Sequence, residues 1–89
     1  ARALEQGVAD LRTRILLGQA RIQLGRFAPA IELLRRTCEE CPDSAVPRAH
    51  LAEALARAGE SEAARAALAE AEKIDPDFGY LVKVRALLE

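Results

Sequence analysis

The sequence predicts an all-α fold in which antiparallel helix pairs stack side by side as a helical-repeat solenoid. First, the chain is dominated by Ala, Leu, Glu and Arg, residue types that favour helices. Second, it contains no β-branched run in which apolar and polar residues alternate, the pattern typical of a strand. Third, the sequence matches itself at the offset that places Gly25 on Gly59, and a fixed offset of this size is typical of stacked helix pairs.

The first repeat is a unit of 34 residues, 11–44, that contains two helices. Its first helix is expected over about Leu11–Leu24 and ends at Gly25, because glycine adopts the left-handed conformation that closes a helix. Its second helix is expected to start at about Ala28. Pro42 stops that helix, since proline lacks a backbone donor and clashes with the preceding turn.

The second repeat, residues 45–78, follows the same logic. Ser44 is expected to cap its first helix, because a serine hydroxyl can accept a hydrogen bond from an otherwise unpaired backbone amide. Gly59 is expected to end that helix, and Ser61 to cap the second one. Pro76 then stops the second helix, as Pro42 does one repeat earlier.

The C-terminal segment, residues 79–89, is expected to form a capping helix. Leu81, Val84 and Leu88 fall on one helical stripe that can pack on the second repeat. Arg85 stands where a regular third repeat would place a buried Leu, which favours a cap over a further repeat. Terminal repeats of a solenoid need such caps, because each unit buries its apolar face only against a neighbour.

The N-terminal flank, residues 1–10, has two interpretations. Ala1–Gln6 aligns with the end of a helix one repeat earlier, which Gly7 would close. Alternatively, residues 2–24 form one long helix with Gly7 inside it, an arrangement that glycine disfavours. In both cases the whole chain of 89 residues is one domain.

At this spacing the sequence resembles the tetratricopeptide repeat. The residues that carry the resemblance are Leu17-Gly18, Ala20, Gly25, Phe27, Ala30, Leu34 and Pro42 in the first repeat, and Leu51-Ala52, Ala54, Gly59, Ala64, Leu68, Ala71 and Pro76 in the second. The small residues among them, such as Gly18, Ala20 and Ala30, would let paired helices pack closely. Arginine replaces the large aromatic residues usual in the first helix, at positions 14, 21 and 48.

The resemblance implies a protein–protein interaction module that presents a concave groove to a peptide or helix of a partner protein, as part of a larger scaffold or adaptor. The family's groove positions fall on Arg12, Ile15, Gln19, Ile22, Gln23, Val46, Ala49, His50, Glu53, Ala56, Arg57, Tyr80 and Lys83. Apolar and hydrogen-bonding side chains alternate there, which suits an extended segment bound by shape and a few hydrogen bonds. The positions at which some family members hold a C-terminal carboxylate do not match.

A structural role is the alternative function. The C-terminal helix is apolar on more than one stripe, with Tyr80, Leu81, Val82, Val84, Leu87 and Leu88. A helix that is apolar on several sides usually has more than one neighbour. On this interpretation the terminal helices mediate homo-oligomerisation or pack on further repeats.

Cys38 and Cys41 form a C-x-x-C motif, which can be half of a zinc site or a redox pair. A structural zinc ion needs four ligands, yet the chain has no second such motif and His50 is its only histidine. The simpler interpretation places Cys38 in the core and Cys41 in the turn, and the metal or redox role stays open. His50 lacks a nearby nucleophile and is interpreted as a groove or surface residue. We therefore predict no metal site, no cofactor, no catalytic residue and no enzyme activity.

The charge and hydropathy of the chain exclude further classes of protein. A formal net charge of −1 lacks the basic surface expected of a general nucleic-acid binder. No apolar stretch approaches the ~20 residues that span a bilayer, and no signal peptide is recognised. We expect no nucleic-acid partner, no membrane insertion and a cytoplasmic location, or a periplasmic one if the chain is a fragment of an exported protein.

Overall fold

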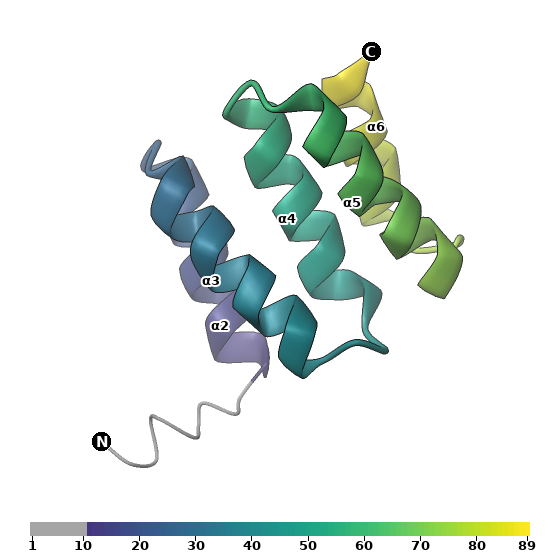
Figure 1. Ribbon diagram of the computed structural model, residues 1–89, viewed down its shortest axis with the longest axis horizontal. Coiled ribbons are helices and arrows are strands. Elements are labelled where there is room, and N and C mark those ends of the chain that lie inside the picture. The colour runs from purple at the N-terminus through teal and green to yellow at the C-terminus, as the bar shows by residue number, and fades with distance from the viewer. Residues whose placement is uncertain (1–10) are drawn as a thin grey trace.

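The computed structural model describes residues 11–89, and this part of the chain folds into helices joined by short turns (Figure 1). The helices are α2 (Leu11–Gln23), α3 (Phe27–Glu40), α4 (Ala45–Arg57), α5 (Ser61–Ile74) and α6 (Tyr80–Leu88). Consecutive helices run antiparallel, and no strand occurs between residues 11 and 89. The prediction of an all-α helical-repeat solenoid is confirmed. The two interpretations of the N-terminal flank concern residues 1–10 and lie outside the described residues.

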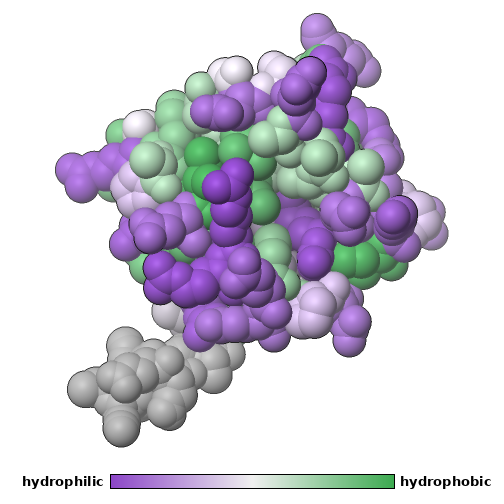
Figure 2. Space-filling model, in the orientation of Figure 1, coloured by the Kyte–Doolittle hydropathy of each residue, from purple (hydrophilic) through white to green (hydrophobic). Residues whose placement is uncertain are grey.

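The helices form two layers. In Figure 1, α3 and α5 lie in front of α2 and α6, and α4 lies between the two pairs. α4 contacts all four other described helices, and nine of its 13 residues are buried. Figure 2 shows the side that carries α3 and α5, which is mostly hydrophilic with a small apolar area. α4 contacts both α2 and α6, and these three helices carry the predicted groove residues.

The predicted helix ends are largely correct. Gly25 and Gly59 have φ values of 78° and 86°, and the residue after each donates its amide to a carbonyl five residues back in the helix, at 2.8 Å. Ser44 caps α4 by accepting a hydrogen bond from the amide of Val46 at 3.3 Å. The cap predicted at Ser61 is wrong. The turn closed by Gly59 is so short that Ser61 is already helical, and no side chain caps α5.

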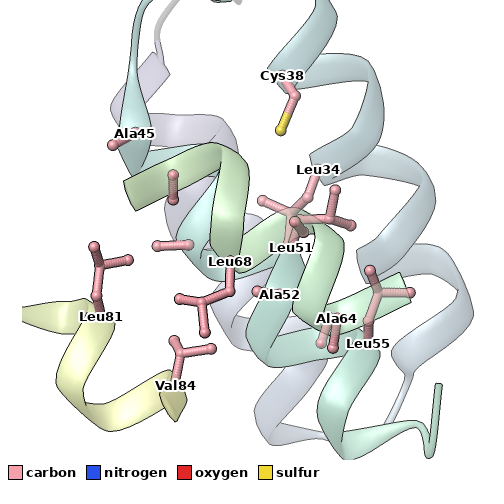
Figure 3. Close-up of a cluster of buried hydrophobic side chains, with 14 of the residues drawn as sticks. Leu34, Cys38, Ala45, Leu51, Ala52, Leu55, Ala64, Leu68, Leu81 and Val84 are labelled. Atoms are coloured by element: carbon pink, nitrogen blue, oxygen red, sulfur yellow. The ribbon is translucent and has the colours of Figure 1, made fainter. Parts of the chain in front are cut away.

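The buried side chains of the five described helices form one core, and Figure 3 shows members of it from α3, α4, α5 and α6. Leu34 is fully buried between α2 and α4, and a Cβ atom on Gly18 would lie 2.9 Å from its Cδ2 atom. Gly18 therefore permits the close approach of α2 and α3 that the sequence predicts. The prediction that Ala20 helps in the same way is wrong, because Ala20 is exposed to solvent on α2.

The arginines that replace aromatic residues bind across helices and turns. Arg14 pairs with the Glu40 carboxylate, Arg21 donates to the carbonyl oxygen of Pro29 at 3.2 Å, and Arg48 donates to that of Pro42 at 3.1 Å. Each guanidinium group is thus held at the edge of the core by a polar partner, while its aliphatic stem can cover apolar surface. Hydrogen bonding at these positions replaces the packing of an aromatic ring.

The C-terminal helix packs as the stripe predicts. Leu81 and Val84 are fully buried, and Leu88 packs against the core while half-buried. Arg85 remains at the edge and binds Glu72 at 2.8 Å. None of the helices between residues 11 and 89 has the length and apolar character that crossing a bilayer requires.

Candidate functional site

An open hollow lies on the side of the molecule shared by α2, α4 and α6, with a volume of about 210 Å³. Three helices contribute its lining, which is Gln19, Ile22, Gln23, Glu53, Tyr80 and Lys83. All six belong to the groove residues named from the sequence. The contacts of α4 with α2 and with α6 bring them together from distant parts of the chain.

The remaining groove residues differ in how far a partner could reach them. Arg12 and Arg57 are exposed, and Val46 and Ala56 are half-buried. Ile15, Ile22, Ala49, His50 and Glu53 are buried in the unbound chain. Of these buried residues, Ile22 and Glu53 line the hollow, whereas Ile15, Ala49 and His50 do not. His50 is 5% exposed, which excludes its interpretation as a plain surface residue.

Glu53 is the centre of the polar contacts around the hollow. It is 4% exposed, and its carboxylate accepts hydrogen bonds from the hydroxyl of Tyr80 and from Nε of Arg57, the latter at 3.1 Å. Nζ of Lys83 lies 3.9 Å from Oε2, and Nδ1 of His50 lies 3.8 Å from Oε1. One buried carboxylate therefore ties α4 to α6, and each of its oxygens has a hydrogen-bond donor.

These contacts set the ionisation of the cluster. Burial alone would raise the pKa of Glu53, but the His50 imidazole, the bonds from Tyr80 and Arg57, and the charge of Lys83 outweigh it and lower that pKa to about 2. Burial, the hydrogen bond to Glu53 and the charge of Glu53 raise the pKa of Tyr80 above its usual value, and the charge of Arg57 and a hydrogen bond with Gln19 oppose this rise only in part. At neutral pH the pair is thus a carboxylate and a neutral phenol that donates to it.

Aromatic contacts fix the position of the Tyr80 ring. The His50 ring packs against it with centroids 4.4 Å apart, and Nζ of Lys83 lies 5.2 Å from the Tyr80 ring centroid. Nδ1 of His50 is buried and has no hydrogen-bond partner among the described residues, since 3.8 Å to Glu53 is too long for one. His50 thus packs against Tyr80 and places its imidazole beside the Glu53 carboxylate.

Both cysteines are free thiols. Cys38 is buried, and its burial raises its pKa to about 11, whereas Cys41 is half-buried in the turn after α3. Among residues 11–89, no three His, Cys, Asp or Glu side chains come together in a way that could hold a metal ion. The structure thus favours packing over metal binding for Cys38.

The sequence analysis named the residues of this site but not the pairing of Glu53 with Tyr80. One part of the cluster could have been recognised, because Glu53 and Arg57 are four residues apart and such pairs meet on a helix surface. Glu53 and Tyr80 lie in different helices, so their spacing in the sequence does not predict their contact.

Comparisons with known proteins agree with the repeat organisation. Two models of the tetratricopeptide repeat match the chain, one over residues 11–52 and the other over residues 48–78. No curated protein and no solved structure matches it. The family comprises non-enzymatic repeat modules that generally mediate protein–protein interactions. Because the two matches together cover residues 11–78 and the helices of this region stack in pairs, the chain belongs to the tetratricopeptide repeat family.

Proposed function

We propose that this chain binds a peptide or helix of a partner protein on the groove side of α2, α4 and α6, as part of a larger scaffold or adaptor, and that it catalyses no reaction. The observation that carries the proposal is the hollow lined by side chains of all three helices. A site assembled from three stacked helices is open to a segment lying across them, and a hollow with apolar and polar lining is a default binding site.

The chemistry of the lining supports a peptide ligand. Ile22 supplies an apolar floor, and the amides of Gln19 and Gln23 stand beside it. Such amides can donate and accept hydrogen bonds, so they can pair with the backbone of an extended segment. The Glu53–Tyr80 bond holds α6 in place at one side of the hollow, so that part of the site is formed before a partner arrives.

The test is selection from a displayed library of random peptides, followed by mapping the best binders by amide NMR. Gln19 and Gln23 are two of only three glutamines, and the chain has no asparagine, so their side-chain amide signals are nearly alone in the spectrum. We expect binders to shift these signals and the backbone signals of α2, α4 and α6. Gln19→Ala should weaken binding, whereas Glu70→Ala, on the exposed surface of α5, should not.

Shifts confined to α3 and α5, or a selection that yields no specific binder, would contradict the proposal. Equal changes in binding for Gln19→Ala and Glu70→Ala would also contradict the proposal, because the effect would then not be specific to the groove side.

Self-association through α6 is the second candidate function. Val82 is 65% exposed and Leu87 39% exposed, so α6 keeps apolar surface after packing on α4 and α5. Light scattering over a wide concentration range tests it. A steady mass near 9.6 kDa would count against self-association. A dimer that Val82→Glu dissociates would favour it, because this substitution places a charge on the exposed side of the helix.

A further inference from the structure

We propose that the hollow between α2, α4 and α6 receives an acidic side chain, Asp or Glu, from within the bound segment, with Lys83 as its cation and Gln19 and Gln23 as amide donors. This inference rests on the proposed function and specifies the chemistry of the partner.

The charged side chains at the hollow carry a net charge opposite in sign to that of the whole chain. The chain carries a formal net charge of −1. The Glu53 carboxylate, however, faces two cations, Lys83 in the lining of the hollow and Arg57 one turn further along α4, so this cluster has one positive charge in excess. Electrostatic complementarity therefore favours an anionic group of the partner at this place.

Glu53 itself is poorly placed to bind a cation of the partner, because it is buried and both of its oxygens already accept internal hydrogen bonds. One of its oxygens accepts the Tyr80 hydroxyl and the other accepts Nε of Arg57, and the residue is 4% exposed. An incoming Lys or Arg side chain would have to displace these internal donors and pass the like charge of Lys83. The one carboxylate of the hollow thus neutralises Arg57 internally and is not offered to the partner.

The ammonium group of Lys83 is paired with Glu53 by charge but donates no hydrogen bond to it. The Lys83 side chain is 56% exposed, and its ammonium group lies 3.9 Å from Glu53, within reach of attraction but beyond hydrogen-bond length. The side-chain amides of Gln19 and Gln23 line the same hollow from α2. An ammonium group and amide N–H groups are donors, so the complementary partner group is an acceptor with negative charge, which describes a carboxylate.

The shape of the hollow suits a single side chain of a segment that lies across the three helices. The hollow is an open depression, and its volume of about 210 Å³ includes solvent space. The buried Ile22 also offers apolar contact to the methylene groups of an Asp or Glu side chain.

The experiment uses random peptides displayed with their C-terminus fused to the carrier, so that no free terminal carboxylate is present. We expect the selected peptides to share an Asp or Glu at a fixed position. Synthetic copies with amidated ends then give dissociation constants by fluorescence anisotropy. Replacing the shared acid by its amide should weaken binding to the unmodified protein by about three- to tenfold, the effect expected of a partly exposed ion pair.

Lys83→Gln is the test variant and Lys73→Gln its matched control, because these are the two lysines of the chain and Lys73 lies exposed on α5. Both substitutions remove one positive charge. We expect Lys83→Gln to weaken binding of the acidic peptide by the same three- to tenfold and to abolish its advantage over the amide version. Lys73→Gln should leave both affinities unchanged. A cooperative thermal unfolding transition of each variant checks that the fold is retained.

Three results would overturn the inference, and they separate it from the proposed function. Peptides that map to α2, α4 and α6 without a shared acid, and that bind Lys83→Gln normally, refute the inference while the proposed function stands. Enrichment only in a parallel library with free C-termini assigns the carboxylate to a chain end and also refutes it. A failure to select any binder from either library contradicts both proposals.

Discussion

Glu53 is a buried carboxylate among four polar side chains, and the cost of burying its charge has to be offset by those neighbours. Removing an ion from water costs several kcal/mol unless hydrogen bonds and opposite charges replace its hydration. Here the Tyr80 hydroxyl, the Arg57 guanidinium group and the Lys83 ammonium group supply that replacement. At the residue scale, the cluster is therefore a structural link that also shapes the groove.

Tyr80 gives a direct test of this link, because it is the only tyrosine and the chain has no tryptophan. Burial and the Glu53 carboxylate raise its pKa, so in a spectrophotometric titration we expect the phenol to ionise well above its ordinary value of 10.0. In Glu53→Gln the midpoint should move back toward 10.0, since the negative charge is gone. The same titration in denaturant is the control, and identical midpoints in folded and unfolded chain would disprove the link.

The two thiols should differ in reactivity. Burial raises the pKa of Cys38 from 9.0 to about 11, which lowers its thiolate fraction about a hundredfold. We expect alkylation at pH 8, followed by mass spectrometry, to show a fast phase from half-buried Cys41 and a much slower one from Cys38. Cys41→Ser should remove the fast phase alone.

Adding zinc to the same alkylation experiment tests whether the C-x-x-C motif binds a metal. If Cys38 serves packing, both alkylation rates stay the same when zinc is present, because the thiol is buried and protonated. Protection of both cysteines by zinc, with release of protons, would instead establish a metal site and contradict the packing interpretation.

At the scale of helices and turns, two glycines close the first helix of each repeat with positive φ, and no atom lies within 4 Å of where their Cβ atoms would be. Substitution at Gly25 or Gly59 therefore tests backbone conformation without steric overlap. We expect Gly25→Ala and Gly59→Ala each to lower the free energy of unfolding by about 1–2 kcal/mol, the cost of a left-handed non-glycine residue. Urea denaturation measures it.

Gly79 is the matched control for these substitutions. It also has open space around its Cβ position, but its φ is −58°, a value that alanine adopts readily. Gly79→Ala should leave stability unchanged or raise it by about 0.4–1 kcal/mol, because it restricts the unfolded chain. If Gly79→Ala lowered the free energy of unfolding as much as Gly25→Ala does, the location of the glycine in a turn, and not the sign of its φ, would determine the loss of stability.

Elements with local signals could be predicted from the sequence. Glycine and proline act within one turn of a helix, so the ends of α2 to α5 were placed within one or two residues. Ser61 was misjudged because serine at a helix start can be either the cap or the first helical residue, and the length of the turn decides between them. Local chemistry thus predicts the helices but not every cap.

Contacts between distant residues could not be predicted in the same way. The repeat identifies which helices stack, so the side shared by α2, α4 and α6 was foreseen. It does not show that Glu53 is buried or that Tyr80 points at it, because this depends on how α6 packs on α4. The arginines at positions 14, 21 and 48 illustrate the same limit, since their partners lie in other helices or turns.

At the scale of the whole molecule, α4 joins the two helix pairs and α6 closes the second one. The buried side chains of Leu81 and Val84 attach α6 to the core. Polar links hold it at its edges, among them Tyr80 to Glu53, Arg85 to Glu72 and Arg65 to the carbonyl oxygen of Leu88. Any condition that protonates Glu53 weakens one of these links. Because α6 completes the hollow, the stability of the molecule and the form of its groove depend on the same carboxylate.

Acid should therefore destabilise the protein through Glu53 over a defined pH range. Its pKa is lowered from 4.5 in an ordinary setting to about 2 in the folded chain, so its stabilising effect is complete above 4.5 and is lost as the pH falls through about 2. The difference corresponds to roughly 3 kcal/mol, taking about 1.4 kcal/mol for each pKa unit. Urea denaturation of the unmodified protein and of Glu53→Gln, at pH values from 7 down to 2, measures it.

At neutral pH we expect Glu53→Gln to be the less stable protein, and the two free energies of unfolding should converge as the pH falls from 4.5 toward 2. Glu70→Gln, which removes an exposed carboxylate from α5, controls for the change in net charge and should keep a constant offset from the unmodified protein. An offset between Glu53→Gln and the unmodified protein that stays constant down to pH 2 would show that hydrogen-bond geometry, and not the charge of Glu53, attaches α6. In that case acid would leave the hollow intact, and the binding of an acidic segment would depend on pH only through the carboxyl group of the segment itself.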